Sequence, residues 1–329
     1  MAVCAVDLYI AHRTAFSMVL SAEGIKEHLR GVAVGLLTPF NEDLDVNHEH
    51  LANNAQSLYD EGINTFLAAA NISEYHSLTF DERIQVIETC VDALPAQACV
   101  LAGVGGNTGD AQQLIRAYSD IGADAMMVMP PDHTYIHEQG LLQYYRKLSD
   151  ATQQPLVPYV KGFNPSVEYL ADLTRIDTVI GIKYALEDPV KLGDATDKGA
   201  DDVVWVNGLA EPYAVAFWAE GVEGFSAGVS NFRPEVGLAL YDALQNENWQ
   251  KARSLRNICL PFQQLRDGTG KENSIPGAIS VPVVKKGLEL AGRHGGYVRE
   301  PITPLDPENE SRAEALYQQL DDNIHDLVH

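Results

Sequence analysis

The chain has 329 residues, and its hydrophobic share of 46% is ample for a large core, which excludes general disorder. Its 46 acidic residues against 23 basic ones give a formal net charge of −23. A surface of that sign repels phosphate backbones and anionic lipids, which argues against nucleic acid and membranes as partners. The same charge suits a protein that stays soluble in concentrated salt, so we expect a halophilic source and a cytoplasmic location.

The N-terminal segment does not have the pattern of a signal peptide. Residues 1–22 are mildly apolar but carry Asp7, His12 and Arg13 within the apolar stretch. We expect residues 1–30 to be a partly unstructured lead-in, with Met18 as an alternative first residue. No apolar run reaches the roughly 18 residues of a membrane span. The cysteines are too few and too scattered for a disulfide framework, and we expect free thiols at Cys4, Cys90, Cys99 and Cys259.

From residue 31 onward, short apolar runs alternate with longer amphipathic segments. Most of the runs are apolar on both faces, as is typical of parallel strands covered by helices. We expect strands at 32–37, 63–69, 98–104, 125–129, 155–160, 179–183, 203–207 and 222–228. The helical patterns between them include 50–62, which ends at Gly62 as a cap, together with 81–94 and 110–122.

This succession of eight βα units predicts a closed (β/α)₈ TIM barrel. A doubly wound open sheet is the alternative, because a count of strands does not prove closure, but no GxGxxG motif follows a strand. After Pro234 the alternation stops, and we expect helices within 234–265, 278–292 and 310–328. The expected regions are therefore the lead-in 1–30, a catalytic barrel at 31–233 and a C-terminal helical region at 234–329.

Reactive side chains of such barrels lie at the face where the strands end. Lys183 closes the sixth strand, and burial there lowers the pKa of its amine, by up to ~3–5 units when it is complete. A neutral amine attacks a ketone to form a Schiff base, whereas a lysine that reaches solvent or a carboxylate stays charged. Tyr159 closes the neighbouring strand, about 4.8 Å away. Its phenol can carry protons for a substrate, or it is simply a core tyrosine.

The loops after two other strands hold candidate binding residues. After the second strand, Asn71, Ile72 and Ser73 offer side chains and backbone N–H groups for a carboxylate. After the eighth strand, small residues that include Ser226 and Gly228 let a substrate lie close to the backbone. The histidines in these loops are not spaced as metal ligands, and we expect no metal and no other cofactor.

Taken together, these residues resemble the dihydrodipicolinate synthase/N-acetylneuraminate lyase family of class I lyases over about residues 31–305. The markers are Gly-Leu-Leu-Thr-Pro-Phe at 35–40, the block at 74–83, the glycine-rich stretch at 103–108, Tyr159, Gly-Ile-Lys at 181–183 and Pro-Ile-Thr-Pro-Leu at 301–305. The resemblance implies a Schiff base between Lys183 and a 2-oxo acid, a proton relay at Tyr159 and a homotetramer.

The chain departs from the family in places that bear on its substrate. The usual Gly-Thr-Thr-Gly-Glu reads Ala-Asn-Ile-Ser-Glu at 70–74, where Asn71 and Ser73 would replace the threonines in part. The stretch after Tyr159 lacks the arginine expected of a synthase that forms a dicarboxylate, which argues against dihydrodipicolinate synthesis. The segment 226–232 and the Pro-Pro pair at 130–131 are more similar to the sugar-acid branch of the family.

We therefore expect a Schiff-base lyase that acts on a 2-keto-3-deoxy sugar acid. The favoured reaction is dehydration, in which the C4 hydroxyl leaves as water. One alternative is retro-aldol cleavage of the same substrate class to pyruvate and an aldehyde. A second alternative is a family member that binds a 2-oxo acid without turning it over.

Overall fold

A computed structural model of the chain describes residues 20–328, and Cys4 and most of the expected lead-in lie outside that range. Within it, eight parallel strands form one closed barrel in sequence order. They are β1 (Val32–Gly35), β2 (Thr65–Ala68), β3 (Cys99–Val104), β4 (Ala125–Val128), β5 (Leu156–Val160), β6 (Gly181–Tyr184), β7 (Val204–Asn207) and β8 (Gly224–Ala227). The last strand pairs with the first, with Ala33 opposite Ser226, which excludes the open-sheet alternative.

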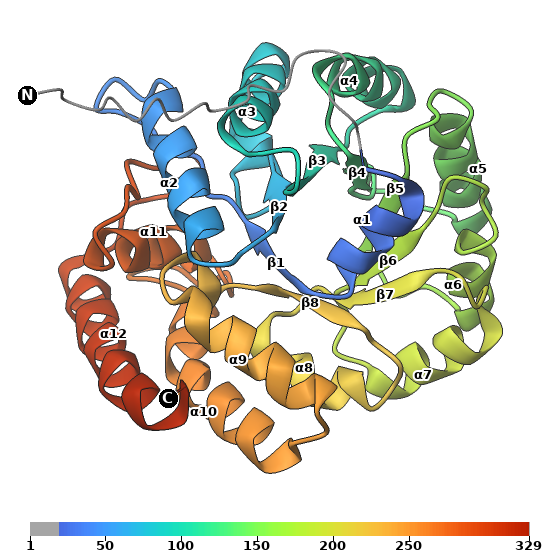
Figure 1. Cartoon of the computed structure of the whole chain (residues 1–329). Helices are drawn as coiled ribbons and strands as arrows, with labels where there is room; N and C mark the ends of the chain where they lie inside the picture. The colour runs from blue at the N-terminus through green and yellow to red at the C-terminus, as the bar shows by residue number, and fades with distance from the viewer. Residues whose placement is uncertain (1–19, 329) are drawn as a thin grey trace, which may run out of the picture.

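Helices surround the barrel (Figure 1). They are α1 (Ala22–Leu29), α2 (His48–Asp60), α3 (Phe80–Ala93), α4 (Thr108–Ile121), α5 (Glu138–Ser149), α6 (Val167–Leu173), α7 (Pro189–Lys198), α8 (Glu211–Trp218), α9 (Pro234–Gln245), α10 (Trp249–Arg266), α11 (Ser280–Leu290) and α12 (Pro307–Val328). Two short 3₁₀ turns, η1 (Tyr75–Ser77) and η2 (Val229–Asn231), follow β2 and β8. No helix in residues 20–328 is both long enough and apolar enough to cross a membrane.

Local sequence signals account for several helix ends. Asn107 caps α4 by accepting a hydrogen bond from the backbone of Asp110, and Gly122 ends the same helix with a φ of 95°. Thr79 and Glu82 form a reciprocal capping box at the start of α3. Gly62, expected as a cap, has a φ of 98° just after α2.

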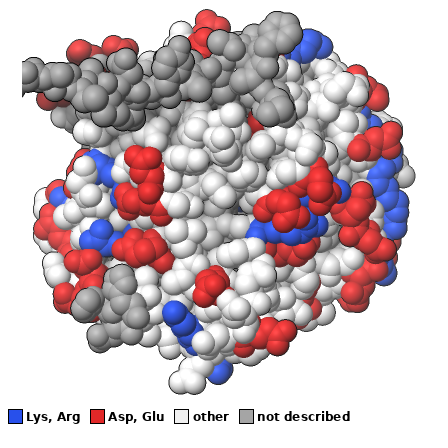
Figure 2. All heavy atoms as spheres, in the orientation of Figure 1, with Lys and Arg blue, Asp and Glu red and all other residues white. Residues whose placement is uncertain are grey.

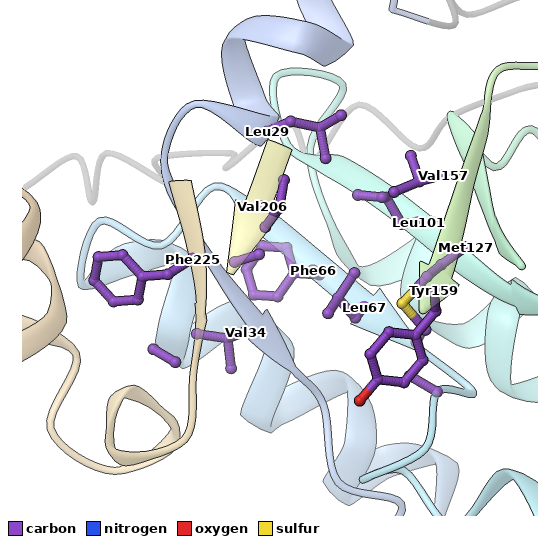
Figure 3. Packing of buried hydrophobic residues seen from close by; sticks show 14 of the residues in the cluster. Leu29, Val34, Phe66, Leu67, Leu101, Met127, Val157, Tyr159, Val206 and Phe225 are labelled. Carbon is purple, nitrogen blue, oxygen red and sulfur yellow. The ribbon is translucent and has the colours of Figure 1, made fainter. Parts of the chain in front are cut away.

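The interior of the barrel is a packed apolar core, and one end of it is closed. Side chains from the strands, among them Leu67, Leu101 and Val157, fill the centre (Figure 3). Helix α1 lies across the start of the strands, and its Leu29 packs so closely on Gly181 that a Cβ there would collide with it. The amino end of the barrel is therefore covered, and only the carboxyl end is open for a site.

The helices after β8 do not all belong to a separate region. Helix α9 follows β8 and packs against β1 and α8, so it completes the eighth βα unit. We therefore propose that the barrel unit ends at Gln245 rather than at residue 233. Helix α10 packs against α8, α9 and α12, while α11 packs against η2 and α12. Of the expected thiols, Cys90, Cys99 and Cys259 are buried and form no disulfide within residues 20–328.

Candidate active site

Lys183 and Tyr159 lie side by side at the open end of the barrel. They occupy paired positions on the adjacent strands β6 and β5. The Nζ atom of Lys183 lies 4.3 Å from the centre of the Tyr159 ring and 3.9 Å from Sδ of Met127. Lys183 is only 8% exposed and Tyr159 only 4%. Figure 3 shows the tyrosine beside Met127 at the edge of the core.

The environment of Lys183 favours a neutral amine. Burial lowers its pKa to about 7, and the positive charge of Lys161 acts in the same direction. Among the described residues, the ammonium has no carboxylate partner that would hold it charged. Burial raises the pKa of Tyr159, which keeps the phenol protonated at neutral pH, and the charge of Arg266 offsets this in part. The pair thus combines a nucleophilic amine with a proton-bearing hydroxyl.

A small cavity of about 130 Å³ opens directly above Lys183, and we call it the inner cavity. Six of the seven residues expected at the site line it: Asn71, Ile72, Tyr159, Lys183, Ser226 and Gly228. Lys161 and Arg266 also line it, and no acidic side chain does. In a chain with a net charge of −23, a cavity lined by Lys161 and Arg266 beside the amine of Lys183 is suited to an anionic ligand.

A larger space of about 650 Å³ continues outward, and we call it the outer cavity. Lys161 and Arg266 border this space as well as the inner one, whereas Lys183 borders only the inner one. Acidic groups first occur here, at Glu74, Glu187 and Asp267. The positive charge is therefore concentrated at the inner end of a continuous path to solvent.

The loop after β2 is held in place by contacts beneath it. Glu74 has a left-handed φ of 60°, and its carboxylate lies 2.6 Å from the Nζ atom of Lys285 on α11. The backbone carbonyl of Ser73 accepts a hydrogen bond of 2.7 Å from Thr38. The Ser73 side chain is fully buried and lines neither cavity, so the structure does not bring this expected binding residue to the ligand space. Asn71 and Ile72 are left to form the cavity wall.

The end of β8 allows a side chain from outside the barrel to reach the site. The Ser226 hydroxyl donates to the backbone carbonyl of Asn207 at 3.3 Å. A Cβ at Gly228 would overlap the guanidinium of Arg266, which lies directly over this glycine. Glycine is therefore needed here to admit the arginine from α10.

The sequence did not identify the two outer cations of the inner cavity. Lys161 directly follows β5, so the rule that barrel sites lie at strand ends could have found it. Arg266 is the last residue of α10, which follows the barrel. The hydrophobic periodicity of a helix predicts which of its faces is buried, but not which residues that face contacts.

A closed (β/α)₈ barrel with a desolvated lysine at the end of β6 and a tyrosine beside it defines a class I, Schiff-base-type lyase. The chain belongs to the dihydrodipicolinate synthetase family, whose model matches residues 28–320. It is 31% identical over 278 residues to a "probable 5-dehydro-4-deoxyglucarate dehydratase 2" of Streptomyces avermitilis, which covers 83% of this chain and 82% of that one. It is 27% identical over 297 residues to a 4-hydroxy-tetrahydrodipicolinate synthase of Natronomonas pharaonis, with coverages of 88% and 97%.

The fold is also that of a solved relative. A crystal structure of dihydrodipicolinate synthase from Oceanobacillus iheyensis superposes with a TM-score of 0.86 at 28% identity. The match covers 92% of this chain and 100% of that one. The resemblance expected from the sequence is confirmed, and the relatives carry the names of both a dehydratase and a synthase.

Proposed function

We propose that the protein is a dehydratase that forms a Schiff base through Lys183 with a 2-keto-3-deoxy sugar acid. The observation that carries the proposal is the buried amine of Lys183, with a pKa of about 7, which lies beside the Tyr159 ring and below an anion-compatible cavity. Relatives named 5-dehydro-4-deoxyglucarate dehydratase support the substrate class.

The reaction follows from the chemistry of an iminium. The neutral Nζ of Lys183 adds to the C2 carbonyl, and the carbinolamine loses water to give the iminium, which draws electrons from C3. Loss of a C3 proton gives an enamine, which then expels the C4 hydroxyl as water once that hydroxyl is protonated. Water adds back at C2, the product leaves and the amine is restored, so the net change is the loss of one water.

The other residues of the inner cavity have proposed roles in this scheme. Tyr159 is the proton carrier, because its hydroxyl stays protonated and its ring is next to the amine. Asn71 and Ile72 hold the carboxylate beside C2. Neither of their backbone N–H groups donates to a protein acceptor within residues 20–328, which leaves both for a ligand. Ser226 and Gly228 line the same cavity at the end of β8.

The first test is borohydride reduction of the protein in the presence of pyruvate, followed by mass mapping of the peptides. We expect a reduced adduct on Lys183 and none in Lys183→Ala. Turnover of a panel of 2-keto-3-deoxy sugar acids then separates the reactions. A product that has lost water supports the proposal, whereas pyruvate plus an aldehyde would establish retro-aldol cleavage.

Three further outcomes would overturn the proposal. Condensation of pyruvate with aspartate semialdehyde would show a synthase. An adduct on Lys183 without turnover of any keto-deoxy acid would show a binding protein instead of an enzyme. If Lys183→Ala kept most of the wild-type activity, the reaction would not proceed through a Schiff base at Lys183.

We also propose that the protein works as a homotetramer in a cytoplasm of high salt. The acidic composition supports the salt requirement, and Figure 2 shows acidic side chains spread over the visible face with basic ones mostly beside them. Salt screens the mutual repulsion of such charges. We expect the unfolding temperature to rise steeply with KCl concentration and light scattering at high salt to give four chains. An unfolding temperature that does not change with salt would contradict the proposed adaptation to high salt. A monomer in light scattering would contradict the tetramer.

A further inference from the structure

The proposed dehydration needs a base that takes up the C3 proton, and neither Lys183 nor Tyr159 is free to be that base. A base accepts a proton only when it is not already protonated. The nitrogen of Lys183 is part of the iminium at this step, so it has no lone pair to offer. The Tyr159 hydroxyl keeps its proton, because burial raises the pKa of the phenol. A further group has to accept the C3 proton.

The inner cavity offers one other side chain of this kind among the described residues that line it. Its titratable groups besides Lys183 and Tyr159 are Lys161 and Arg266. A guanidinium does not give up its proton in a protein, so Arg266 has no free lone pair to accept another. Lys161 can exist as a neutral amine. The neighbouring carboxylates and imidazole line the outer cavity instead of the inner one, at Glu74, His76, Glu187 and Asp267.

The place of Lys161 in the barrel brings its amine to the substrate beyond C2. The residue directly follows β5 and stands two positions after Tyr159. Side chains two positions apart along a strand point to the same face, and both residues line the inner cavity. Lys161 also borders the outer cavity, whereas Lys183 does not. A substrate joined to Lys183 through C2 therefore carries C3 and C4 from the amine of Lys183 toward that of Lys161.

The surroundings of Lys161 favour a neutral amine. Desolvation and then the positive charge of Arg266 lower its pKa, and the negative charge of Asp267 acts in the opposite direction. Asp267 and Glu211 also act on Arg266, so the guanidinium is partly compensated. No ion pair or hydrogen bond from residues 20–328 holds the Lys161 ammonium. The iminium formed at Lys183 adds a fixed positive charge, which favours loss of the Lys161 proton further.

We propose that Lys161 is a further catalytic residue, the base that removes the C3 proton from the iminium. The inference rests on the proposed function. The C3–H bond breaks, its electron pair forms the C2=C3 bond of the enamine, and Nζ of Lys161 binds the proton. The enamine then expels the C4 hydroxyl, which takes the proton of Tyr159 and leaves as water. Lys161 passes its proton to the Tyr159 phenolate, so both side chains recover their starting forms and one water is lost.

Exchange of the methyl protons of pyruvate with D₂O tests the C3 step by itself. The methyl carbon of pyruvate is C3, so each enamine formed on Lys183 takes up a deuteron when it returns to the iminium. We expect the wild type to exchange and Lys161→Met to exchange about 10²- to 10⁴-fold more slowly, the usual contribution of a positioned base. Water loss from a 2-keto-3-deoxy acid should fall by a similar factor in kcat. The assay is run at about pH 9, above the pKa of about 7 of Lys183, so that loss of a neighbouring charge does not change its protonation.

Matched variants separate proton transfer from charge and from folding. Lys161→Arg keeps the positive charge, but a guanidinium accepts no proton, so its exchange should be as slow as that of Lys161→Met. Lys147→Met is the same change at an exposed side chain of α5 that lines neither cavity, and it should exchange like the wild type. Tyr159→Phe should keep the exchange and lose the later release of water. The borohydride adduct on Lys183 should form in all four variants.

The outcomes that would overturn the inference differ from those that would overturn the proposed function. Exchange in Lys161→Met within a factor of three of the wild type would show another base. Exchange kept in Lys161→Arg would show that Lys161 acts through its charge alone, and this variant decides the question should Lys161→Met form no adduct. Loss of the adduct in both variants would place Lys161 in imine formation. A wild type that traps no 2-oxo acid refutes the proposed function instead, and one that exchanges pyruvate but dehydrates no keto-deoxy acid refutes only the dehydratase.

Discussion

Glu74 and Lys285 form an ion pair of 2.6 Å although both side chains are almost completely buried. The pair joins the loop after β2 to α11, and the Lys285 ammonium also donates to the backbone carbonyl of Tyr297. Its effect on the site is indirect. By anchoring Glu74 in its left-handed conformation, it fixes Asn71 and Ile72 at the wall of the inner cavity.

Removal of one partner of this pair should therefore be strongly destabilising. We expect Lys285→Met to lower the free energy of unfolding by about 3–5 kcal/mol, because it leaves a buried carboxylate without its cation. The double variant Glu74→Gln/Lys285→Met should lose less than the sum of the single changes. Chemical denaturation at constant salt measures both. A Lys285→Met protein as stable as the wild type would show that the pair does not hold the loop.

Imine formation should depend on pH through the amine of Lys183. Its pKa of about 7 lies below the ordinary value of 10.5, so the ammonium is the main form below pH 7 and the nucleophilic amine above it. We expect the rate of trapping with pyruvate to rise about tenfold per pH unit below 7 and to level off above it. In Lys161→Gln the rise should move to higher pH, because a neighbouring positive charge is removed. A profile that rises only near pH 10 would contradict the burial of the amine.

Tyr159→Phe should separate imine formation from the later proton transfers. We expect turnover to fall by about 10²- to 10⁴-fold, the usual contribution of a positioned acid or base. The reduced adduct on Lys183 should still form, since the phenylalanine ring fills the same space beside the amine. Turnover within a factor of three of the wild type would make Tyr159 a packing residue.

The Glu82 carboxylate should contribute to resistance against acid. Hydrogen bonds from Arg299 at 2.6 and 2.8 Å, with those from the backbone and side chain of Thr79, lower its pKa to about 2 from 4.5. A carboxyl group whose pKa is lower in the folded protein stabilises it above pH 4.5, and that contribution is lost as the pH falls toward 2. Glu82→Gln should cost about 1–2 kcal/mol at pH 7 and nearly nothing at pH 2. Thermal unfolding at several pH values measures the difference, and an equal cost at every pH would contradict it.

The sequence by itself determined the strands and the candidate pair of Lys183 and Tyr159. A parallel strand buried on both faces needs an apolar run, so each of the eight runs was recognisable. The observed strands lie within the expected ranges, except that β6 ends one residue later, at Tyr184. Lys183 and Tyr159 could be placed together because consecutive parallel strands are neighbours and end at the same face. Both inferences need only local pattern and connectivity.

Only the tertiary structure decided how the barrel closes and what surrounds the pair. The pairing of β8 with β1 is a contact between residues far apart in the chain, which no local pattern encodes. Arg266 enters the site because α10 packs against α8 and because Gly228 leaves space for its guanidinium. Ser73 turns into the core although its neighbour Asn71 faces the cavity. Hydrophobic periodicity tells which side of an element is buried, whereas the partner it meets depends on the packing of the whole chain.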